Sequence, residues 1–327
     1  DVPISWTKTF GGPDWDVCSS VQQTTDGGYI ITGSAPSFAN GDDELYLIKT
    51  DVNGDSLWTK IFSGGRGSSI QQTADGGYII TGATFLGNGD DDVCLIKTDQ
   101  SGNEQWFKTF GGTEWDVGYS VQQTTDGGYI VTGLTSSFGN WSDLYLIKTD
   151  GSGNEQWFKT FGGTYLDIGE SVQQTNDGGY IITGATSSFG NGSEEVLLFK
   201  TDGNGDSLWT KTFGGTDMDE DWGNSVQQTN DGGYIILGWT HPDPTPGSFE
   251  DSEVLLIKTD GSGNEEWTKT YGGADGESGN SVQQTNDGGY IIAGSTSSFG
   301  NGDEDVYLIK TDGSGNEQWF KTFGGVD

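Results

Sequence analysis

The tripeptide Gly-Gly-Tyr, which recurs at a nearly constant spacing, constrains this chain more than any other feature. It lies within a longer repeated stretch, for which residues 120–133 (SVQQTTDGGYIVTG) are typical, and it ends at six tyrosines: Tyr29, Tyr78, Tyr129, Tyr180, Tyr234 and Tyr290. The intervals between them run from 49 to 56 residues. A period of this length is the signature of a repeat architecture, in which each unit packs against the next. We therefore expect six repeats of about 50 residues within a single domain over residues 1–327.

Each repeat predicts four short strands, and residues 111–161 illustrate the pattern. Strands are expected at 120–124, 129–132, 144–148 and 157–161, because Val, Ile, Tyr, Phe, Trp and Thr are concentrated there. Asp126-Gly-Gly and the turn at 150–154 offer the positive φ angles of tight hairpins, and a longer loop covers 136–143. No apolar period of 3.6 residues is present, so we expect almost no helix.

Four antiparallel strands repeated six times indicate an all-β fold, a six-bladed β-propeller of four-stranded antiparallel blades. A β-sandwich would not repeat its sequence so faithfully: residues 149–163 and 311–325 are the same fifteen residues. A parallel β-helix has shorter repeats. The second and third strands are apolar on both faces, which fits blades that pack on two neighbours.

The order of motifs within a repeat resembles known proteins. A glycine-rich turn, a Tyr-Ile-Ile-Thr-Gly strand, a Tyr-Leu-Ile-Lys strand and a Trp-x-Lys strand are similar to kelch-type topology. The Gly-Gly-Tyr-Ile and Asp-Gly-Asn-Gly-Asp-x-x-Trp signatures resemble secreted bacterial and archaeal β-propeller repeat proteins more closely. The resemblance covers the whole chain and implies the propeller fold, with the Gln-Gln strand innermost and the Trp strand outermost. It implies no activity, because propellers carry many functions.

Charge limits the partners of this chain. The sequence has 49 acidic and 14 basic residues, a net charge of −35, which repels nucleic acid and anionic membranes. No apolar run approaches the length of a membrane span. The chain begins at Asp1 rather than Met, as a secreted product or an excised fragment would, and we expect an extracellular or cell-surface location. Cys18 and Cys94 occupy unlike positions and predict small buried or half-buried thiols rather than a disulfide framework.

Calcium is the one cofactor that the sequence indicates. The turn Asp-x-Asn/Ser-Gly-Asp/Asn occurs in all six repeats, with oxygen ligands at alternate positions as in the first half of a calcium loop. The alternative is a plain hairpin in which Asp caps its own backbone. Two copies carry two carboxylates and are the metal-site candidates: Asp51, Asn53 and Asp55, and Asp202, Asn204 and Asp206.

Two further polar features have structural and functional interpretations. One Gln of each Gln-Gln pair is expected to line a hydrated central channel, where a ring of amides could also hold a ligand or an ion. Asn140-Trp-Ser and Asn191-Gly-Ser match the N-glycosylation sequence. Because Asn40, Asn88 and Asn301 occupy the same turn without the sequon, Asn there also serves the turn alone. An intact mass equal to that of the bare polypeptide would exclude glycosylation at Asn140 and Asn191.

The sequence predicts no enzyme. The only histidine, His241, lies in a proline-rich insertion and is expected to be an exposed loop residue rather than a triad member. We interpret the chain as a structural or surface-interaction module. The first alternative is a carbohydrate-binding propeller. In that interpretation the loop tryptophans stack on sugar rings, and the candidates are Trp15, Trp115, Trp141, Trp222 and Trp239. Trp15 and Trp115 could instead pack between blades. A secreted hydrolase is the second alternative, because paired carboxylates for glycoside cleavage are abundant.

The sequence contains seven copies of the outer, Trp-containing strand but six copies of each of the other three strands of the repeat. The Trp strand begins at seven positions: Trp6, Trp58, Trp106, Trp157, Trp209, Trp267 and Trp319. Either the first copy (Trp6, Lys8, Phe10) or the last (Trp319, Lys321, Phe323) can complete the sixth blade, and the other is surplus. The surplus strand predicts pairing with an exposed blade edge of a neighbouring copy, giving a head-to-tail homo-oligomer or filament. The alternatives are a fifth strand on the same blade, or an excerpt from a longer array.

Overall fold

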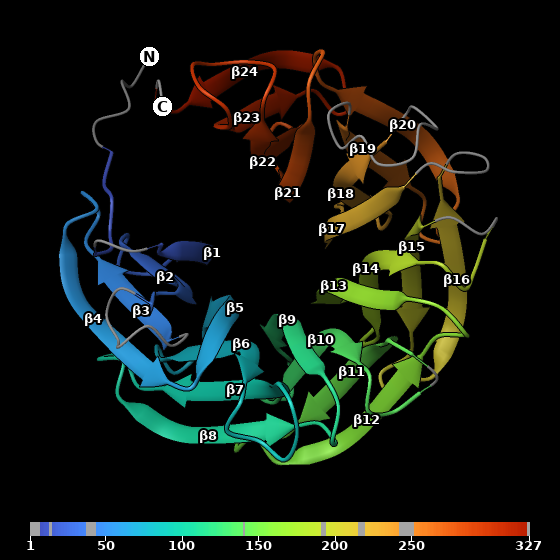
Figure 1. The fold of residues 1–327 in the computed structure, drawn as a ribbon. Coiled ribbons are helices and arrows are strands. Elements are labelled where there is room, and N and C mark those ends of the chain that lie inside the picture. The colour runs from blue at the N-terminus through green and yellow to red at the C-terminus, as the bar shows by residue number, and fades with distance from the viewer. Residues whose placement is uncertain are drawn as a thin grey trace. The chain divides into compact units, whose positions relative to one another are not determined.

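The computed structural model describes residues 7–12, 15–36, 44–139, 141–190, 194–214, 220–241 and 252–325. These residues form twenty-four strands and no helix, so no described helix could cross a membrane. Every four consecutive strands make one antiparallel sheet in chain order, and each sheet is one blade (Figure 1). The all-β, six-bladed propeller class expected from the repeats is confirmed. The chain divides into two compact units, residues 1–161 with blades 1–3 and residues 162–327 with blades 4–6.

The first unit contains twelve strands among its described residues. Blade 1 comprises β1 (Val17–Gln23), β2 (Tyr29–Ser34), β3 (Glu44–Thr50) and β4 (Ser56–Ser63); blade 2 comprises β5 (Gly65–Gln72), β6 (Tyr78–Thr84), β7 (Asp92–Thr98) and β8 (Glu104–Phe110); blade 3 comprises β9 (Asp116–Gln123), β10 (Tyr129–Thr135), β11 (Asp143–Thr149) and β12 (Glu155–Phe161).

The second unit repeats this order. Blade 4 comprises β13 (Asp167–Gln174), β14 (Tyr180–Thr186), β15 (Glu195–Thr201) and β16 (Ser207–Phe213); blade 5 comprises β17 (Asp221–Gln228), β18 (Tyr234–Thr240), β19 (Glu253–Thr259) and β20 (Glu265–Tyr271); blade 6 comprises β21 (Glu277–Gln284), β22 (Tyr290–Thr296), β23 (Asp305–Thr311) and β24 (Glu317–Phe323).

The first strand of a blade is longer than its apolar pattern predicts. In blade 3, β9 begins at Asp116 rather than Ser120, because the connection continues the ladder past a β-bulge. The bulge places Tyr119 between the pairs Ser120–Thr132 and Gly118–Gly133, where the register shifts by one residue. Gly133 has to be glycine, since a Cβ there would lie 1.8 Å from the carbonyl oxygen of Val117. The strand therefore begins four residues before the start at 120 that the apolar pattern predicts.

The core lies between blades and is built from their two middle strands. Every residue of β10 and β11 is buried, as expected for strands covered on both faces. One cluster joins Ile79 and Leu95 of blade 2 to Val121, Tyr129 and Tyr145 of blade 3. Burial of such side chains contributes about 2 kcal/mol each. Each unit is therefore held together mainly by contacts between residues about one repeat apart.

The Ser-Val-Gln-Gln motif caps the edge of the neighbouring first strand. The N–H groups of Val121 and Gln123 donate to Ser69 Oγ (3.4 Å) and Gln71 Oε1 (2.6 Å) of blade 2. In return, the N–H of Ala74 donates to the amide oxygen of Gln123 (2.8 Å). Without these acceptors the edge N–H groups would have no partner inside the unit. The side-chain oxygens of Gln71 and Gln123 are therefore committed to the backbone of adjacent blades, and the lining of a central channel by the Gln-Gln pairs stays a prediction.

A buried lysine joins the two hairpins of each blade. In blade 3 the Lys148 side chain is 4% exposed, and its Nζ contacts the Asp126 carboxylate (2.9 Å) and the carbonyl of Thr149 (2.8 Å). Desolvation acts to raise the pKa of Asp126, but the Thr124 hydroxyl, the Gly128 N–H and Lys148 together hold it at about 2. Equivalent pairs occur in the other blades: Asp26–Lys49, Asp75–Lys97, Asp177–Lys200, Asp231–Lys258 and Asp287–Lys310.

Candidate functional site

The outer strand of a blade also packs on the next blade, and the Trp-x-Lys motif makes that contact. The Trp106 ring of β8 lies edge-on to Tyr129 of blade 3, with centroids 5.8 Å apart. Gly153 leaves room for this ring, since a Cβ there would lie 2.7 Å from Trp106. Two positions on, Lys108 Nζ donates to Asn154 Oδ1 (3.4 Å). The same Trp–Tyr contact recurs within the units as Trp58–Tyr78, Trp209–Tyr234 and Trp267–Tyr290.

Blade 1 carries the same kind of surface on which an outer strand packs in the other blades. Residues 7–10 occupy part of this surface. Lys8 Nζ donates to Asp55 Oδ1 at 2.7 Å, as Lys108 does to Asn154. Phe10 packs against a buried cluster of Ala35, Tyr46 and Ile48. Residues 7–12 form no strand, but Lys8 and Phe10 lie against blade 1 as an outer strand lies against the blade after it. Trp6 lies outside the described residues.

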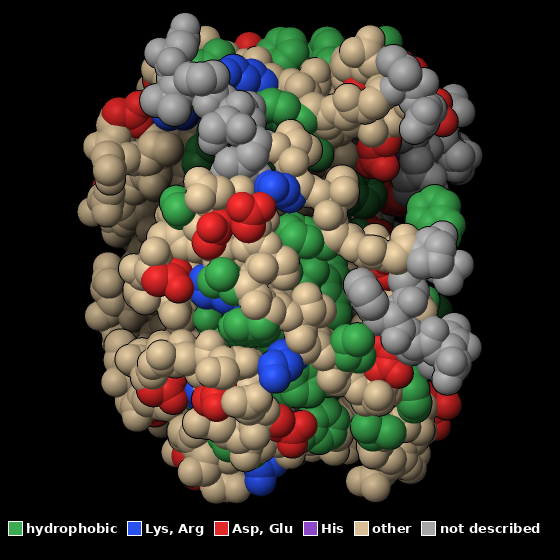
Figure 2. All heavy atoms as spheres, turned by 90° about the vertical axis from the view of Figure 1, so that its left-hand side faces the viewer, with side chains coloured by type: hydrophobic (Ala, Val, Ile, Leu, Met, Phe, Trp, Pro, Cys, Tyr) green, Lys and Arg blue, Asp and Glu red, His purple; other side chains and the backbone are tan. Residues whose placement is uncertain are grey.

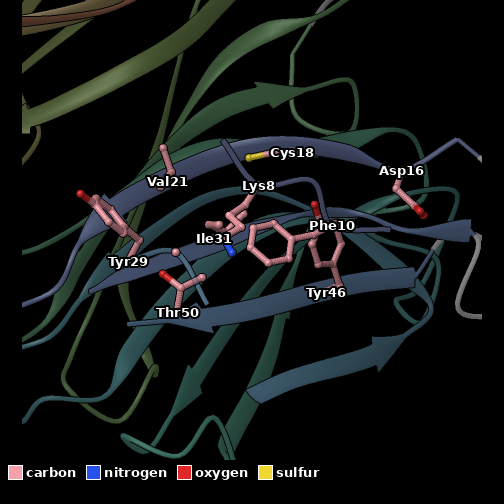
Figure 3. Close-up of a pocket in the computed structure, with 10 residues that line it drawn as sticks. Lys8, Phe10, Asp16, Cys18, Val21, Tyr29, Ile31, Tyr46 and Thr50 are labelled. Carbon is pink, nitrogen blue, oxygen red and sulfur yellow. The ribbon is translucent and has the colours of Figure 1, made fainter. Parts of the chain in front are cut away.

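A cavity of about 480 Å³ remains beside this segment. Its lining includes Tyr29 and Gly54, which correspond to the Tyr129 and Gly153 that enclose Trp106 in blade 3. Figure 3 shows the Phe10 ring lying between Ile31 and Tyr46, with Lys8 close by. The cavity therefore has the lining that receives the tryptophan of an outer strand.

The last copy of the motif forms β24, the outer strand of blade 6, which pairs antiparallel with β23. Its Trp319 and Phe320 side chains are both 40% exposed, and Phe323 is 37% exposed. Lys321 Nζ lies 5.7 Å from the centroid of the Trp319 ring. Of the two copies that could complete blade 6, the last one does so, and described residues of the first lie on blade 1.

Exposed hydrophobic side chains are not confined to β24. Figure 2, which turns the left-hand side of Figure 1 toward the viewer, shows them mixed with acidic and basic side chains. Leu57 and Ile61 of β4 are among the exposed ones. Among the strands that the structure describes, each outer strand pairs with one other strand only, so the outer strands combine apolar contact area with the edge of a sheet.

The two turns proposed for calcium use their first aspartate for the backbone. Asp51 Oδ1 accepts the N–H groups of Asn53 (2.8 Å) and Asp55 (2.9 Å). The hydrogen bond from the Asp55 N–H is the largest of the interactions that lower the pKa of Asp51. Asp202 does the same with Asn204 (2.8 Å) and Asp206 (2.9 Å). This is the geometry of the hairpin alternative, with Gly54 at φ 76°. Calcium at these turns stays a prediction.

An exposed tryptophan stands beside a charged pair at the loop end of blades 2 and 3. Arg66 Nη2 lies 2.5 Å from Asp91 Oδ2, and Trp115 Nε1 donates to the same oxygen at 3.2 Å. Trp115 is 51% exposed and Trp15 is 89% exposed, so the expectation that these rings pack between blades is wrong. Both lie in inter-blade connections, outside the strands that form the core. Arg66 is the only arginine of the chain, which is the one sequence feature that marks this group.

Blade 5 differs from the other blades in its aromatic residues. Trp222 of β17 and Trp239 of β18 are cross-strand partners whose rings stack with centroids 6.2 Å apart and planes 8° apart. Burial raises the pKa of Glu170, in β13 of blade 4, to about 7, although the Trp222 side chain hydrogen-bonds its carboxyl. The expectation that His241 is exposed is wrong. His241 follows the end of β18 and is buried, and its backbone N–H donates to the Glu220 carbonyl (3.0 Å).

The remaining candidate residues are two asparagines and the two cysteines. The glycosylation candidates Asn140 and Asn191 lie outside the described residues. Cys94 is buried as predicted, whereas Cys18 is exposed, and neither forms a disulfide. Within the described part of the chain, no group of three or more His, Cys, Asp or Glu side chains is arranged to hold a metal ion.

The fold and its repeated blade contacts define the class of protein as a β-propeller. No family model and no curated protein matches the sequence. Solved structures similar to this chain include two described as WD40 domains. The WD40 β-propeller domain of Doa1 is 16% identical with a TM-score of 0.52, covering 86% of this chain and 74% of that one. Sqt1 from Chaetomium thermophilum is 11% identical with a TM-score of 0.53, covering 93% and 71%. The Pan2 WD40 domain of Neurospora crassa is 10% identical with a TM-score of 0.54, covering 91% and 76%.

Proposed function

We propose that this chain is a non-enzymatic structural or surface-interaction module, located outside the cell or on its surface, that joins copies of itself head to tail. In this proposal the segment from Trp6 to Phe10 of one copy, whose described residues 7–10 lie on their own blade 1, adds as a strand to an exposed blade edge of a neighbouring copy, namely β24. The contact is heterologous, so it builds a filament unless the rotation closes into a ring.

The observation that carries the proposal is the position of residues 7–10. Lys8 and Phe10 hold this segment on blade 1 through the same contacts that fix a paired outer strand elsewhere. Yet residues 7–12 form no strand. The segment is therefore aligned for strand addition, a recognition mode in which backbone hydrogen bonds supply affinity. The acceptor in this proposal is β24 of the neighbouring copy, an outer strand on which Trp319 and Phe320 are exposed.

The experiment compares the intact protein with two truncations by analytical ultracentrifugation and electron microscopy. Deletion of residues 1–10 removes the donor segment, and deletion of residues 319–327 removes most of the acceptor strand. We expect both to abolish assembly. The first variant keeps an acceptor edge, so adding it in small amounts to the intact protein should cap growing ends and shorten the filaments.

Phe85→Asp is a matched control, because Phe85 is exposed on blade 2, away from both terminal segments, and its replacement should leave assembly unchanged. Phe10→Asp should weaken assembly, since it disrupts docking of the donor segment on blade 1. An intact protein that is monomeric at all concentrations would refute the proposal. Assembly that survives both deletions would refute it equally.

A second function, carbohydrate binding, is favoured by the Trp115–Asp91–Arg66 group. An exposed indole held by a carboxylate that also binds a guanidinium combines an aromatic platform with charged hydrogen-bonding groups. Trp115→Ala should abolish glycan binding on a broad array, while Trp141→Ala tests a more exposed ring, 69% against 51%, for which no charged partner is described. An array with no hit at high protein concentration removes this function.

The hydrolase alternative has Glu170 as its best acid, because its pKa of about 7 suits proton donation near neutrality. The hydrogen bond from Trp222 gives that carboxyl a structural role in the contact between blades 4 and 5. Robust hydrolysis in a substrate screen, lost in Glu170→Gln, would overturn the non-enzymatic proposal.

A further inference from the structure

Two buried aspartates meet where blade 2 joins blade 3. Asp92 begins β7 and is 2% exposed, and Asp116 begins β9 and is fully buried. A methyl group on Gly111, in the connection between β8 and β9, would lie 2.0 Å from Asp92 Oδ1 and 2.5 Å from Asp116 Oδ2. These two oxygens are therefore at most about 4.5 Å apart, the sum of those distances.

The two carboxylates differ in how they are satisfied. Asp116 Oδ2 accepts the Gly112 N–H (2.8 Å) and the Ser137 hydroxyl (2.6 Å), and its Oδ1 accepts the Thr135 hydroxyl. Asp92 Oδ2 accepts the N–H of Asn88 at 2.6 Å, but Asp92 Oδ1 is buried without a hydrogen-bond partner. A buried carboxylate oxygen left in this state is costly, and more so beside a second carboxylate.

No cationic side chain compensates this pair within the described part of the chain. Arg66, the nearest candidate by position, is engaged by Asp91, the residue before Asp92. The local arrangement is not an isolated accident of blade 2. In blade 6, Asp305 Oδ2 accepts the N–H of Asn301 (2.7 Å), and Asp305 Oδ1 is again buried without a partner.

We propose that Asp92 and Asp116 bind a divalent cation, Ca²⁺ by preference, at the junction of blades 2 and 3. Ca²⁺ takes oxygen ligands at about 2.3–2.6 Å, so two oxygens at most about 4.5 Å apart can both reach one ion. Carboxylates are its preferred ligands, and backbone carbonyls and water complete such sites. The ion would supply the charge that the protein does not and would clamp β7 of one blade to β9 of the next.

The site is distinct from the calcium turns expected from the sequence. Those turns lie between the third and fourth strands, whereas Asp92 and Asp116 begin the third and first strands at the opposite ends of the blades. Antiparallel pairing places these two kinds of position at opposite ends of a sheet. Substitutions can therefore address the two sites separately.

The test measures Ca²⁺ binding by calorimetry and by the luminescence of Tb³⁺, which replaces Ca²⁺ and is excited by energy transfer from a nearby indole. Trp115 precedes Asp116 and serves as the donor. We expect the wild-type chain to bind Ca²⁺ in physiological salt, with a rise of a few degrees in Tm that chelation reverses. Asp92→Asn should bind one ion fewer per chain. Trp115→Phe should keep that ion and lose the corresponding Tb³⁺ emission.

Asp51→Asn together with Asp55→Asn is the matched control, because it removes two carboxylates from a turn and should leave the Trp115-dependent emission intact. An Asp92→Asn chain that binds as many ions as the wild type, with unchanged emission, would overturn the proposal. A wild-type chain whose Tm does not change when Ca²⁺ is added would also overturn the proposal. A Tm that rises in Asp92→Asn without any Ca²⁺ response would show that the pair shares a proton instead.

Discussion

Glu170 provides the sharpest test of how the blades are held together. Its folded-state pKa is about 7, against 4.5 for an ordinary glutamate, because burial at the junction of blades 4 and 5 disfavours the charged form. A pKa raised by folding means that the folded state binds the proton more tightly. The resulting stability is complete below pH 4.5 and is lost as the pH rises through about 7.

The magnitude follows from the two pKa values. The interval from 4.5 to about 7 corresponds to about 3 kcal/mol, which is the upper bound on what ionised Glu170 costs above pH 8. Glu170→Gln removes the charge and keeps an oxygen that can accept from the Trp222 side chain. We therefore expect the free energy of unfolding of the variant to exceed that of the wild type by less than about 1 kcal/mol near pH 5 and by about 2–3 kcal/mol near pH 8.5.

Urea unfolding followed by tryptophan fluorescence, repeated from pH 5 to pH 9, measures the effect. This range avoids the acid region in which aspartates such as Asp126, with a pKa of about 2, become protonated. Glu155→Gln is the control, because Glu155 is exposed on β12 and its replacement should leave the pH profile unchanged. If Glu170→Gln and wild type show parallel pH profiles, Glu170 is ionised at no cost and the reasoning fails.

Two further predictions concern the repeated contacts. Lys148→Ala should lower the free energy of unfolding by about 2 kcal/mol or more in urea titrations, because it leaves buried acceptors unpaired, whereas Lys321→Ala on an exposed position should change it by less than about 0.5 kcal/mol. Gly127→Ala and Gly153→Ala both place alanine at positive φ, 83° and 75°, a cost of about 1 kcal/mol each. Gly153→Ala should lower the free energy of unfolding clearly more than Gly127→Ala. The Cβ added at Gly153 would lie 2.7 Å from Trp106, while the one added at Gly127 meets nothing within 4 Å. Equal losses of stability in the two variants would contradict the packing role of Gly153.

Local chemistry made much of the fold predictable from the sequence. The Asp126-Gly-Gly turn and the turn at 150–154 lie where expected, with Gly127 and Gly153 at positive φ, because turn conformation depends on neighbouring residues alone. The middle strands β10 and β11 follow from continuous apolar runs bounded by such turns. The sequence also indicated the Trp-x-Lys strand as a unit of contact, since its seven copies stand out against six of every other element.

What only the tertiary structure decided depends on residues about one repeat apart. Gln71 accepts from the backbone of the next blade, and Trp115 turns outward to Asp91, which no local pattern reveals. The meeting of Asp92 with Asp116 is of the same kind. The sequence marks Asp92 as the end of an acidic loop, Asp90-Asp-Asp92, but it does not indicate that Asp116 of the next blade lies beside it. Blade 6 takes β24 as its outer strand, although the first copy of the Trp-x-Lys motif carries nearly the same residues. The tight turn at 312–316 joins β24 directly to β23, whereas the place of residues 7–10 against blade 1 depends on contacts with residues far along the chain, such as Lys8 with Asp55.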